Sequence, residues 1–362
     1  MKAYFLILTV ICSLSVNSLW AQEKINWISP QEASAVQGRI HGDAIADYGR
    51  LEKKMEAALR PAVWSLGTNA AGLYVDFKTT AESIQVRYKV KGALQMPHMP
   101  AIGVSGVDLY AFDGKDWSWA SGQYAFKDTI TYNFASIGSH PDFTYRLYLP
   151  LYNTVEWLEI GVAEGQKVQF FTEKQRPIVI YGTSIAQGAC ASRPGLGWTN
   201  ILGRMQQQPI VNLGFSGNGR LEEPLLKLIC EANPSLIVLD CLPNLGVSAT
   251  RTMAQVDSTV QHAVRYIRAV HPKTPILMTA HSSGNNPRIL NTKKNIEYEQ
   301  TSEVGIRAFE ALKKAAVPNI YFLSNKAIGL DENMTVDYAH PNDLGMMKIA
   351  QAYRDMLKRI LK

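Results

Sequence analysis

The sequence predicts two domains, an all-β sandwich with jelly-roll-like topology followed by an α/β domain built on a parallel sheet. Two patterns of apolar and polar residues along the chain support this prediction. Up to about residue 172, apolar and polar residues alternate with the period of half-buried strands. From about residue 176, short apolar runs alternate with amphipathic segments of helical length, which is typical of a parallel sheet covered by helices on both faces. At 362 residues, the chain is long enough to bury two cores.

The first region contains two clear strand signals. In SIQVRYKV, the apolar residues Ile84, Val86 and Tyr88 are separated by single polar residues, so their side chains share one face of a strand. In VDLYAFDGKDWSWASG, Asp113 and Gly114 lie between two aromatic-rich runs, which favours a tight hairpin. Repeated strands of this kind predict the sandwich.

The polar run TEKQRP closes the first region, so we place the sandwich domain at residues 22–172 and the α/β domain at residues 176–362. The strands expected in the second domain are IVIYG, IVNLGF, SLIVLDC, PILMTA and NIYFL. The expected helices are WTNILGRMQQQ, EEPLLKLICEA, MAQVDSTVQHAVRYIRAV, SEVGIRAFEALKKAA and LGMMKIAQAYRDMLKRIL. In open sheets of this type, the functional site lies beyond the carboxyl ends of the strands. Side chains that follow those strands are therefore the candidates for chemistry.

Residues 1–21 have the features of a secretory signal, with Lys2, an apolar stretch, and Ala21 before a polar sequence. The alternative, a membrane anchor, is disfavoured because the apolar stretch is shorter than the roughly 20 residues that a spanning helix needs. Nothing later in the sequence is apolar enough to span a membrane. We therefore expect an exported protein, periplasmic or secreted, with no integral membrane segment after signal cleavage.

Composition argues against several partners and bound groups. The formal net charge is +6, but no dense basic run is interleaved with aromatic residues, so a nucleic-acid partner is not expected. After signal removal, Cys190, Cys230 and Cys241 remain, and three cysteines cannot all pair within one chain. The seven histidines are dispersed and no Cys-x-x-Cys pair occurs, so no metal site is expected. The oligomeric state and any disulfide stay open.

Ser184 lies in the stretch VIYGTSIAQG, directly after the first expected strand of the α/β domain. A small residue at such a point is often only part of a turn. A serine hydroxyl attacks acyl groups when a base accepts its proton and hydrogen-bond donors stabilise the resulting oxyanion. A nucleophilic role for Ser184 therefore depends on whether the rest of the chain supplies a base and donors.

Three other stretches supply them. VDYAHPNDLG places Asp337 and His340 three residues apart, a spacing that lets a carboxylate bind an imidazole; the alternative is a polar loop in which His340 caps the last helix. NLGFSGNG ends the second strand, where Gly217 offers either a backbone N–H or only a tight turn. CLPN follows the third strand, where Asn244 provides either a side-chain amide or a turn after Pro243.

Two further residues are candidates for substrate binding. Trp198 follows the serine loop in RPGLGWTN and offers a platform for a sugar ring, or else anchors the core at the start of a helix. His281 ends the fourth strand in TAHSSG and faces the predicted crevice, where it contacts substrate or has a structural, hydrogen-bonded role.

The blocks that carry Ser184, Gly217, Asn244 and the closing Asp-x-x-His stand in a fixed order, and in this the chain resembles the SGNH, or GDSL-like, hydrolases. It departs from the family at Thr183, where Asp is usual, and at CLPN, where many members have Gly-x-Asn. GVDLY and LPLYN also resemble the β-sandwich domain that precedes the catalytic domain in one bacterial branch, whose relatives deacetylate carbohydrates. The resemblance covers nearly the whole mature chain.

The resemblance implies a flavodoxin-like three-layer αβα hydrolase domain. It implies that Ser184 is the nucleophile, His340 its base and Asp337 the acid that orients the base. The oxyanion hole is then formed by the N–H groups of Ser184 and Gly217 and by the amide of Asn244.

The activity implied is that of an exported serine esterase, which needs no cofactor and removes short acyl groups, acetyl in particular, from carbohydrate. A lipase or an acyltransferase with the same machinery is one alternative, and a catalytically inactive carbohydrate-binding protein is another. The glycan, the ester position and the acyl chain length stay open.

Overall fold

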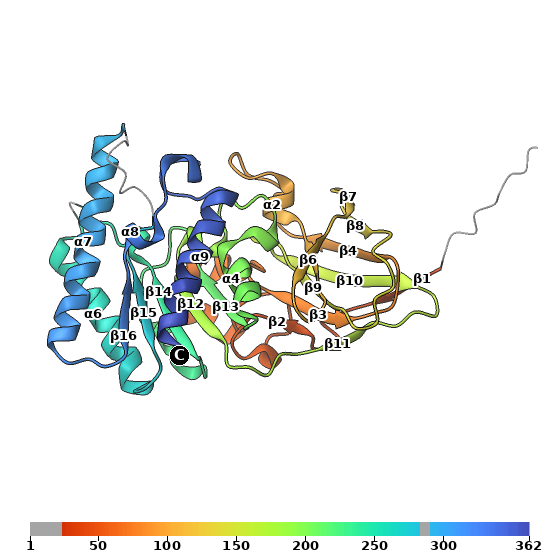
Figure 1. Cartoon of the computed structure of the whole chain (residues 1–362), viewed down its shortest axis with the longest axis horizontal. Helices are drawn as coiled ribbons and strands as arrows, with labels where there is room; N and C mark the ends of the chain where they lie inside the picture. Colours follow the sequence, from red (N-terminus) through yellow and green to blue (C-terminus); the bar gives the residue numbers. More distant parts are fainter. Residues whose placement is uncertain (1–23, 249, 283–289, 362) are drawn as a thin grey trace, which may run out of the picture.

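The structure of the chain, a computed structural model, describes residues 24–248, 250–282 and 290–361. The predicted signal at residues 1–21 lies outside this part. The β-sandwich and the parallel sheet with its helices lie side by side along the long axis of the molecule (Figure 1). The fold class predicted from the sequence is confirmed.

Antiparallel strands in two sheets form the sandwich. The first sheet has the spatial order β1 (Ile25–Ile28), β10 (Val155–Ala163), β4 (Ile84–Val90), β8 (Ile130–Phe134) and β7 (Gln123–Ala125). The second has the order β11 (Gln169–Phe171), β3 (Tyr74–Lys78), β9 (Thr144–Tyr148), β5 (Asp108–Phe112) and β6 (Trp117–Ala120), and β2 (Val36–Gln37) also pairs with β3. Ile84, Val86 and Tyr88, which alternation assigned to one face, are buried in the core of the sandwich. The expected hairpin joins β5 and β6 at Gly114, whose φ is +97°.

The second domain is built on a five-stranded parallel sheet. Its spatial order is β13 (Ile210–Gly214), β12 (Ile178–Gly182), β14 (Leu236–Asp240), β15 (Ile276–Thr279) and β16 (Ile320–Leu323). The first strand along the chain thus has the second and third as its neighbours, which is the flavodoxin-like order. The loops after these three strands consequently meet at one edge of the sheet.

Helices cover both faces of this sheet, as the alternation of short apolar runs with amphipathic segments predicted (Figure 1). Ile178 and Ile180 of β12 belong to the apolar cluster with α4 (Trp198–Gln206) and α9 (Asp343–Ile360). Val179 and Tyr181 belong to the cluster with α5 (Glu223–Glu231), α6 (Met253–Val270) and α7 (Thr292–Lys314). The shorter α-helices are α1 (Pro61–Gly67), α2 (Ala101–Ser105), α3 (Ser184–Gln187) and α8 (Asn325–Ile328).

One helix is longer than its sequence pattern indicates. The apolar period predicts a helix from Ser302, whereas α7 begins ten residues earlier at Thr292. The side chain of Asn291 accepts the N–H of Lys294 and caps this end. The added turns are mostly exposed and polar, so they leave no apolar stripe for the sequence to show.

The segment between β2 and β3, residues 38–73, packs against the second domain. Ile40, Leu51, Leu59 and Val63 lie in the same apolar cluster as β13 and α5. Its most buried polar group is Arg50, which is 1 % exposed. The two domains therefore share a continuous apolar interior at their junction.

Arg50 ties this segment to the end of β13. Its guanidinium donates to the carbonyl oxygens of Asn212 at 3.0 Å and Gly214 at 2.8 Å, and also to those of Leu66 at 2.7 Å and Asn69 at 3.0 Å. Burial lowers the pKa of Arg50 to about 9. The four carbonyl acceptors are what allows this cation to lie inside the protein.

The GVDLY motif makes a second tie across the junction. The Asp108 carboxylate accepts from Arg193 at 2.5 Å and from the backbone N–H of Gly195 at 2.9 Å, both in the segment that follows α3. The indole N–H of Trp119 donates to the same carboxylate at 2.6 Å. Asp108 thus fixes the chain that leaves the Ser184 turn.

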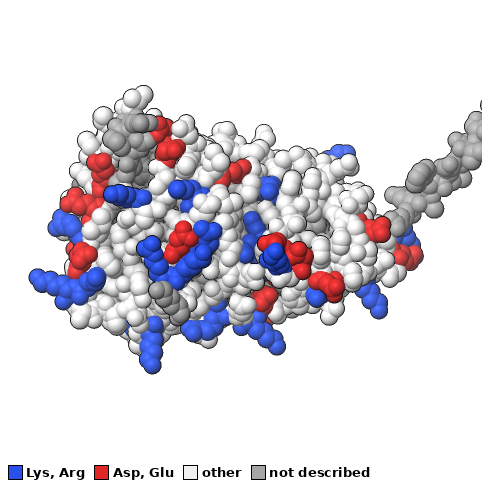
Figure 2. Space-filling model, in the orientation of Figure 1, with Lys and Arg blue, Asp and Glu red and all other residues white. Residues whose placement is uncertain are grey.

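Two surface properties bear on partners. None of the helices in the described ranges is both long enough and apolar enough to cross a membrane. Acidic and basic side chains are interspersed on the face shown in Figure 2.

Candidate active site

Ser184 occupies the turn between β12 and α3. β12 ends at Gly182, Thr183 is the N-cap of α3, and Ser184 is its first residue. The Thr183 hydroxyl accepts the N–H of Ile185 at 3.4 Å, so this residue caps the helix in place of the Asp usual in the resembling family. The N–H groups of a first helical turn have no acceptor within the helix, which leaves the N–H of Ser184 available to a ligand.

Ser184, His340 and Asp337 are joined by hydrogen bonds. Ser184 Oγ lies 2.8 Å from His340 Nε2, and His340 Nδ1 lies 2.8 Å from Asp337 Oδ2. The serine is 7 % exposed, whereas the side chains of His340 and Asp337 are 31 % and 46 % exposed. The hydroxyl, the imidazole and the carboxylate therefore form a chain in the order needed to move a proton from Ser184.

Asp337 is held as an acceptor. Burial by itself would raise its pKa, but hydrogen bonds from the side chain and backbone of His340, the charge of that imidazole, and the N–H of Ala339 together lower the pKa below its ordinary value of 3.8. Asp337 Oδ1 accepts the two backbone N–H groups at 2.7 and 3.0 Å, which leaves Oδ2 for the ring. The carboxylate thus orients the imidazole toward Ser184.

The alternative role of His340 as a helix cap is not observed. α9 begins at Asp343, and Asn342 caps it by accepting the N–H of Gly345 at 3.2 Å. Asp343 accepts the N–H of Ser192 at 2.9 Å, which ties the start of α9 to the chain after the Ser184 turn.

Gly217 borders the same edge of the sheet. Its φ is +67°, and a side chain placed there would meet no described atom within 4 Å, so the residue faces open space. The loop is fixed on both sides, because Phe215 N–H donates to Gly182 O at 3.1 Å and Asn218 N–H donates to Phe215 O at 2.8 Å. Gly219 packs so closely on the Gly182 carbonyl that a Cβ there would overlap it.

Asn244 reaches this loop from the end of β14. Its Oδ1 accepts the N–H of Gly219 at 3.0 Å, so its Nδ2 is the part of the amide directed elsewhere. Two hydrogen bonds hold the turn itself. The N–H of Asn244 donates to Cys241 O at 3.0 Å, and the Arg251 guanidinium donates to Asn244 O at 3.0 Å. The unusual CLPN block therefore still delivers an amide beside the Gly217 loop.

The structure contradicts the prediction of a sugar platform at Trp198. The ring is 0 % exposed and stacks on Tyr353 of α9, with centroids 4.3 Å apart and planes 15° apart. Packing between α4 and α9 leaves neither face for a ligand. Trp198 anchors the core, the alternative that the sequence left open.

His281 is 3 % exposed and stacks on Tyr298 of α7, with centroids 4.2 Å apart. Stacking against a helix favours a packing role for this ring. A substrate contact at His281 stays a prediction.

Cys190 lies near Asp337, but its thiol is not activated as a nucleophile. Burial, with a smaller contribution from the Asp337 charge, raises the pKa of its thiol to about 11. A thiol of this kind is protonated at neutral pH. Cys190, Cys230 and Cys241 are all free, so no disulfide joins them.

A group of possible metal ligands lies elsewhere, where α5 ends at the opposite edge of the sheet from Ser184. His41, Glu52 and Glu231 present ligand atoms within 4.8 Å of one another. Lys54 Nζ, 2.9 Å from Glu52, already supplies a cation there. The cluster therefore lies apart from the candidate active site.

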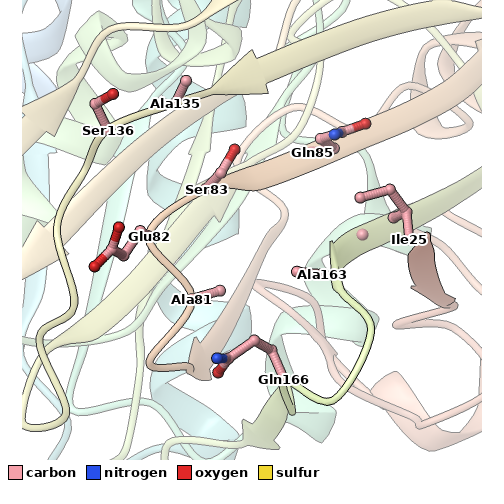
Figure 3. A pocket seen from close by; sticks show the side chains of 10 residues that line it. Ile25, Ala81, Glu82, Ser83, Gln85, Ala135, Ser136, Ala163 and Gln166 are labelled. Atoms are coloured by element: carbon pink, nitrogen blue, oxygen red, sulfur yellow. The ribbon is translucent and has the colours of Figure 1, made fainter. Parts of the chain in front are cut away.

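The sandwich also carries a hollow of about 420 Å³, shown in Figure 3. Its lining includes Ile25, Ser83, Gln85 and Gly161, which come from β1, β10 and the start of β4. The hollow contains none of the residues near Ser184, so it is separate from the candidate active site.

Two family models match the chain. Residues 175–358 match the GDSL-like Lipase/Acylhydrolase family, and residues 25–168 match GxDLY, the N-terminus of Esterase_SGNH_hydro-type. No curated protein sequence matches the chain significantly.

Several solved structures are similar over nearly the whole chain. A protein described as a GDSL-like lipase from Bacteroides ovatus is 28 % identical with a TM-score of 0.84, and the match covers 93 % of this chain and 98 % of that one. Salicylyl-acyltransferase SsfX3 from a tetracycline biosynthetic pathway is 18 % identical with a TM-score of 0.72, covering 92 % and 97 %. A family two carbohydrate esterase from Cellvibrio japonicus is 11 % identical with a TM-score of 0.58, covering 94 % and 98 %. The last two similarities show the fold alone.

The lowered pKa of Asp337 predicts how its contribution to stability depends on pH. The ionised carboxylate stabilises the fold above its unfolded pKa near 3.8, and this contribution is lost as the pH falls through the lower folded value. The difference in unfolding free energy between wild type and Asp337→Asn should therefore shrink as the pH falls from about 5 to 2. Denaturant titrations in this window, below the pH at which ordinary imidazoles change charge, measure it. A difference that grows on acidification would contradict this electrostatic description.

Proposed function

Because the chain belongs to the GDSL-like lipase/acylhydrolase family, we propose that it is a serine esterase that removes short acyl groups, acetyl in particular, from carbohydrate. The observation that carries this proposal is the hydrogen-bonded series of Ser184, His340 and Asp337, with 2.8 Å at each step. A catalytically inactive binding protein has no need for this arrangement, so the geometry argues against that alternative.

The first half of the reaction forms an acyl-enzyme. His340 Nε2 takes the proton of Ser184 as Oγ bonds to the ester carbonyl carbon. The resulting oxyanion accepts hydrogen bonds from the N–H groups of Ser184 and Gly217 and from Asn244 Nδ2. As the ester C–O bond breaks, His340 gives its proton to the departing sugar oxygen, which leaves as a hydroxyl.

The second half releases the acyl group. His340 accepts a proton from water, and the water oxygen bonds to the carbonyl carbon of the acyl-serine. The same three donors stabilise the second oxyanion. The bond to Ser184 Oγ then breaks, and the serine recovers its proton from His340. The products are a carboxylic acid and the free sugar hydroxyl, and the balance requires no cofactor.

The carbohydrate part of the proposal is supported by two observations. Solved structures with the same fold include family two carbohydrate esterases. The side chains of His340 and Asp337 are partly exposed, which suits an ester carried on a large polar molecule. The similarity to a salicylyl-acyltransferase keeps acyl transfer as the second candidate, in which an alcohol replaces water in the second half of the reaction.

Export is part of the proposal and rests on the pattern of residues 1–21. We expect the mature protein to begin near Gln22 and to be found outside the cytoplasm. Cell fractionation and N-terminal sequencing of the protein expressed from its full sequence test this. An intact N-terminus on cytoplasmic protein would contradict export.

Ser184→Ala should abolish release of acetate from 4-nitrophenyl acetate and from acetylated polysaccharides while the protein stays folded, because only one loop hydroxyl is lost. Acetate release and circular dichroism measure the two effects, and a panel of acetylated glycans identifies the substrate. Thr183→Ser, which keeps the capping hydroxyl, serves as a control with activity near wild type. Full activity in Ser184→Ala would refute the nucleophile assignment. Transfer of acetyl to an added alcohol in preference to water would favour the acyltransferase.

Asn244→Asp separates the two parts of the Asn244 amide. An aspartate keeps an oxygen for the N–H of Gly219 but has no N–H of its own. If Nδ2 binds the oxyanion, Asn244→Asp and Asn244→Ala should both lower kcat by roughly 10²–10³-fold, with KM changed far less. Steady-state kinetics on 4-nitrophenyl acetate measure this. Near wild-type kcat in Asn244→Asp would mean that Asn244 only supports the turn.

A further inference from the structure

The Gly217 loop is anchored to the sandwich domain through Gln187, a fully buried residue of α3. Gln187 Oε1 accepts the N–H of Ser216 at 2.9 Å. Its Nε2 donates to Leu151 O and to Asn69 Oδ1, at 3.3 Å in each case. Both of these acceptors belong to the sandwich domain, so one amide joins that domain to the residue before Gly217.

Tyr152 of the sandwich domain makes a second connection. Its hydroxyl donates to Ser184 O at 3.4 Å, and the Ser216 side chain lies close enough to lower the pKa of the phenol in part. Tyr152 is 9 % exposed, and burial raises the pKa of its phenol above the ordinary value of 10, so the hydroxyl stays protonated. One side chain thus contacts the residue of the nucleophile and the residue before Gly217.

Gly217 needs such anchors because glycine adopts many backbone conformations at little cost. The N–H of Gly217 belongs to the peptide that joins it to Ser216, so anchoring Ser216 restricts the direction of that N–H. A donor to an oxyanion is effective only when it is aimed at the developing charge, and an error of about 1 Å can cost roughly 10²-fold in rate.

We propose that the oxyanion hole is assembled across the domain junction, with Tyr152 and Asn69 acting together with Gln187 as positioning residues for the catalytic loops. The inference rests on the proposed esterase function. It gives the sandwich domain a part in the chemical step, in addition to any part in the choice of substrate.

Tyr152→Phe removes only the hydroxyl and tests this directly. We expect kcat on 4-nitrophenyl acetate to fall by roughly 10-fold or more while KM changes less than 2-fold, because the ground state does not use the oxyanion donors. Tyr148→Phe is the matched control. Tyr148 is also buried and its hydroxyl also crosses the junction at 3.4 Å, but it donates to Asn200 O in α4, away from the catalytic loops. The kcat of Tyr148→Phe should equal that of wild type.

Two further measurements separate positioning from general loosening of the fold. Phenylboronic acid forms a tetrahedral adduct on a reactive serine, so its inhibition constant should rise in Tyr152→Phe by about the same factor as kcat/KM falls. The pH at which activity is half-maximal should not change, because His340 and Asp337 keep their contacts. Equal losses of kcat in Tyr152→Phe and Tyr148→Phe would overturn the inference and leave only a structural role.

Asn69→Ala provides a test that leaves Tyr152 in place. It removes one hydrogen-bond acceptor of Gln187 on the sandwich side. We expect kcat to fall by roughly 2- to 10-fold, which is the rate factor that corresponds to the free energy of one hydrogen bond. The effect should vanish when Asn69→Ala is added to Gln187→Met, which has already lost that bond. Wild-type kcat in both Asn69→Ala and Tyr152→Phe would overturn the inference. An inactive wild-type protein would instead contradict the proposed esterase function.

Discussion

The buried guanidinium of Arg50 is the contact on which the junction between the domains depends. It satisfies four backbone carbonyls from both sides of the junction, including those of Asn212 and Gly214 in β13. A buried acceptor that loses its donor costs about 1–3 kcal/mol, so these bonds hold the segment of residues 38–73 firmly against the second domain. Because β13 ends at Gly214, the same contact sets where the Gly217 loop begins.

Sheet topology brings the groups of the candidate active site together. β12 lies between β13 and β14, so Ser184, Gly217 and Asn244 each follow one of three adjacent parallel strands. His340 arrives from the loop before α9, which Asp343 ties to the chain after the Ser184 turn. Residues 156 positions apart, Ser184 and His340, therefore meet at 2.8 Å as a consequence of strand order and one helix position.

The sequence predicted those features that a repeating pattern or a strand end can reveal. The alternation of apolar and polar residues predicted the sandwich. The order of the Ser, Gly, Asn and Asp-x-x-His blocks indicated the loops that the structure brings together, although the departure at CLPN left the position of Asn244 open. The role of Trp198 stayed open because an aromatic residue beside the Ser184 loop has the same sequence pattern whether it faces solvent or the core. Gln187, Tyr152 and Arg50 were missed because their contacts cross between domains and leave no period in either one.

The proposed mechanism requires that Ser184 is acylated in an active centre completed by both domains. Rapid quenching of the full-length protein during turnover of 4-nitrophenyl acetate, followed by peptide mass spectrometry, tests this most directly. We expect a single acetyl group on the peptide that contains Ser184, with lower occupancy at early times in Tyr152→Phe than in Tyr148→Phe. Turnover without an acetyl group on Ser184, or with the group on Cys190, would contradict it.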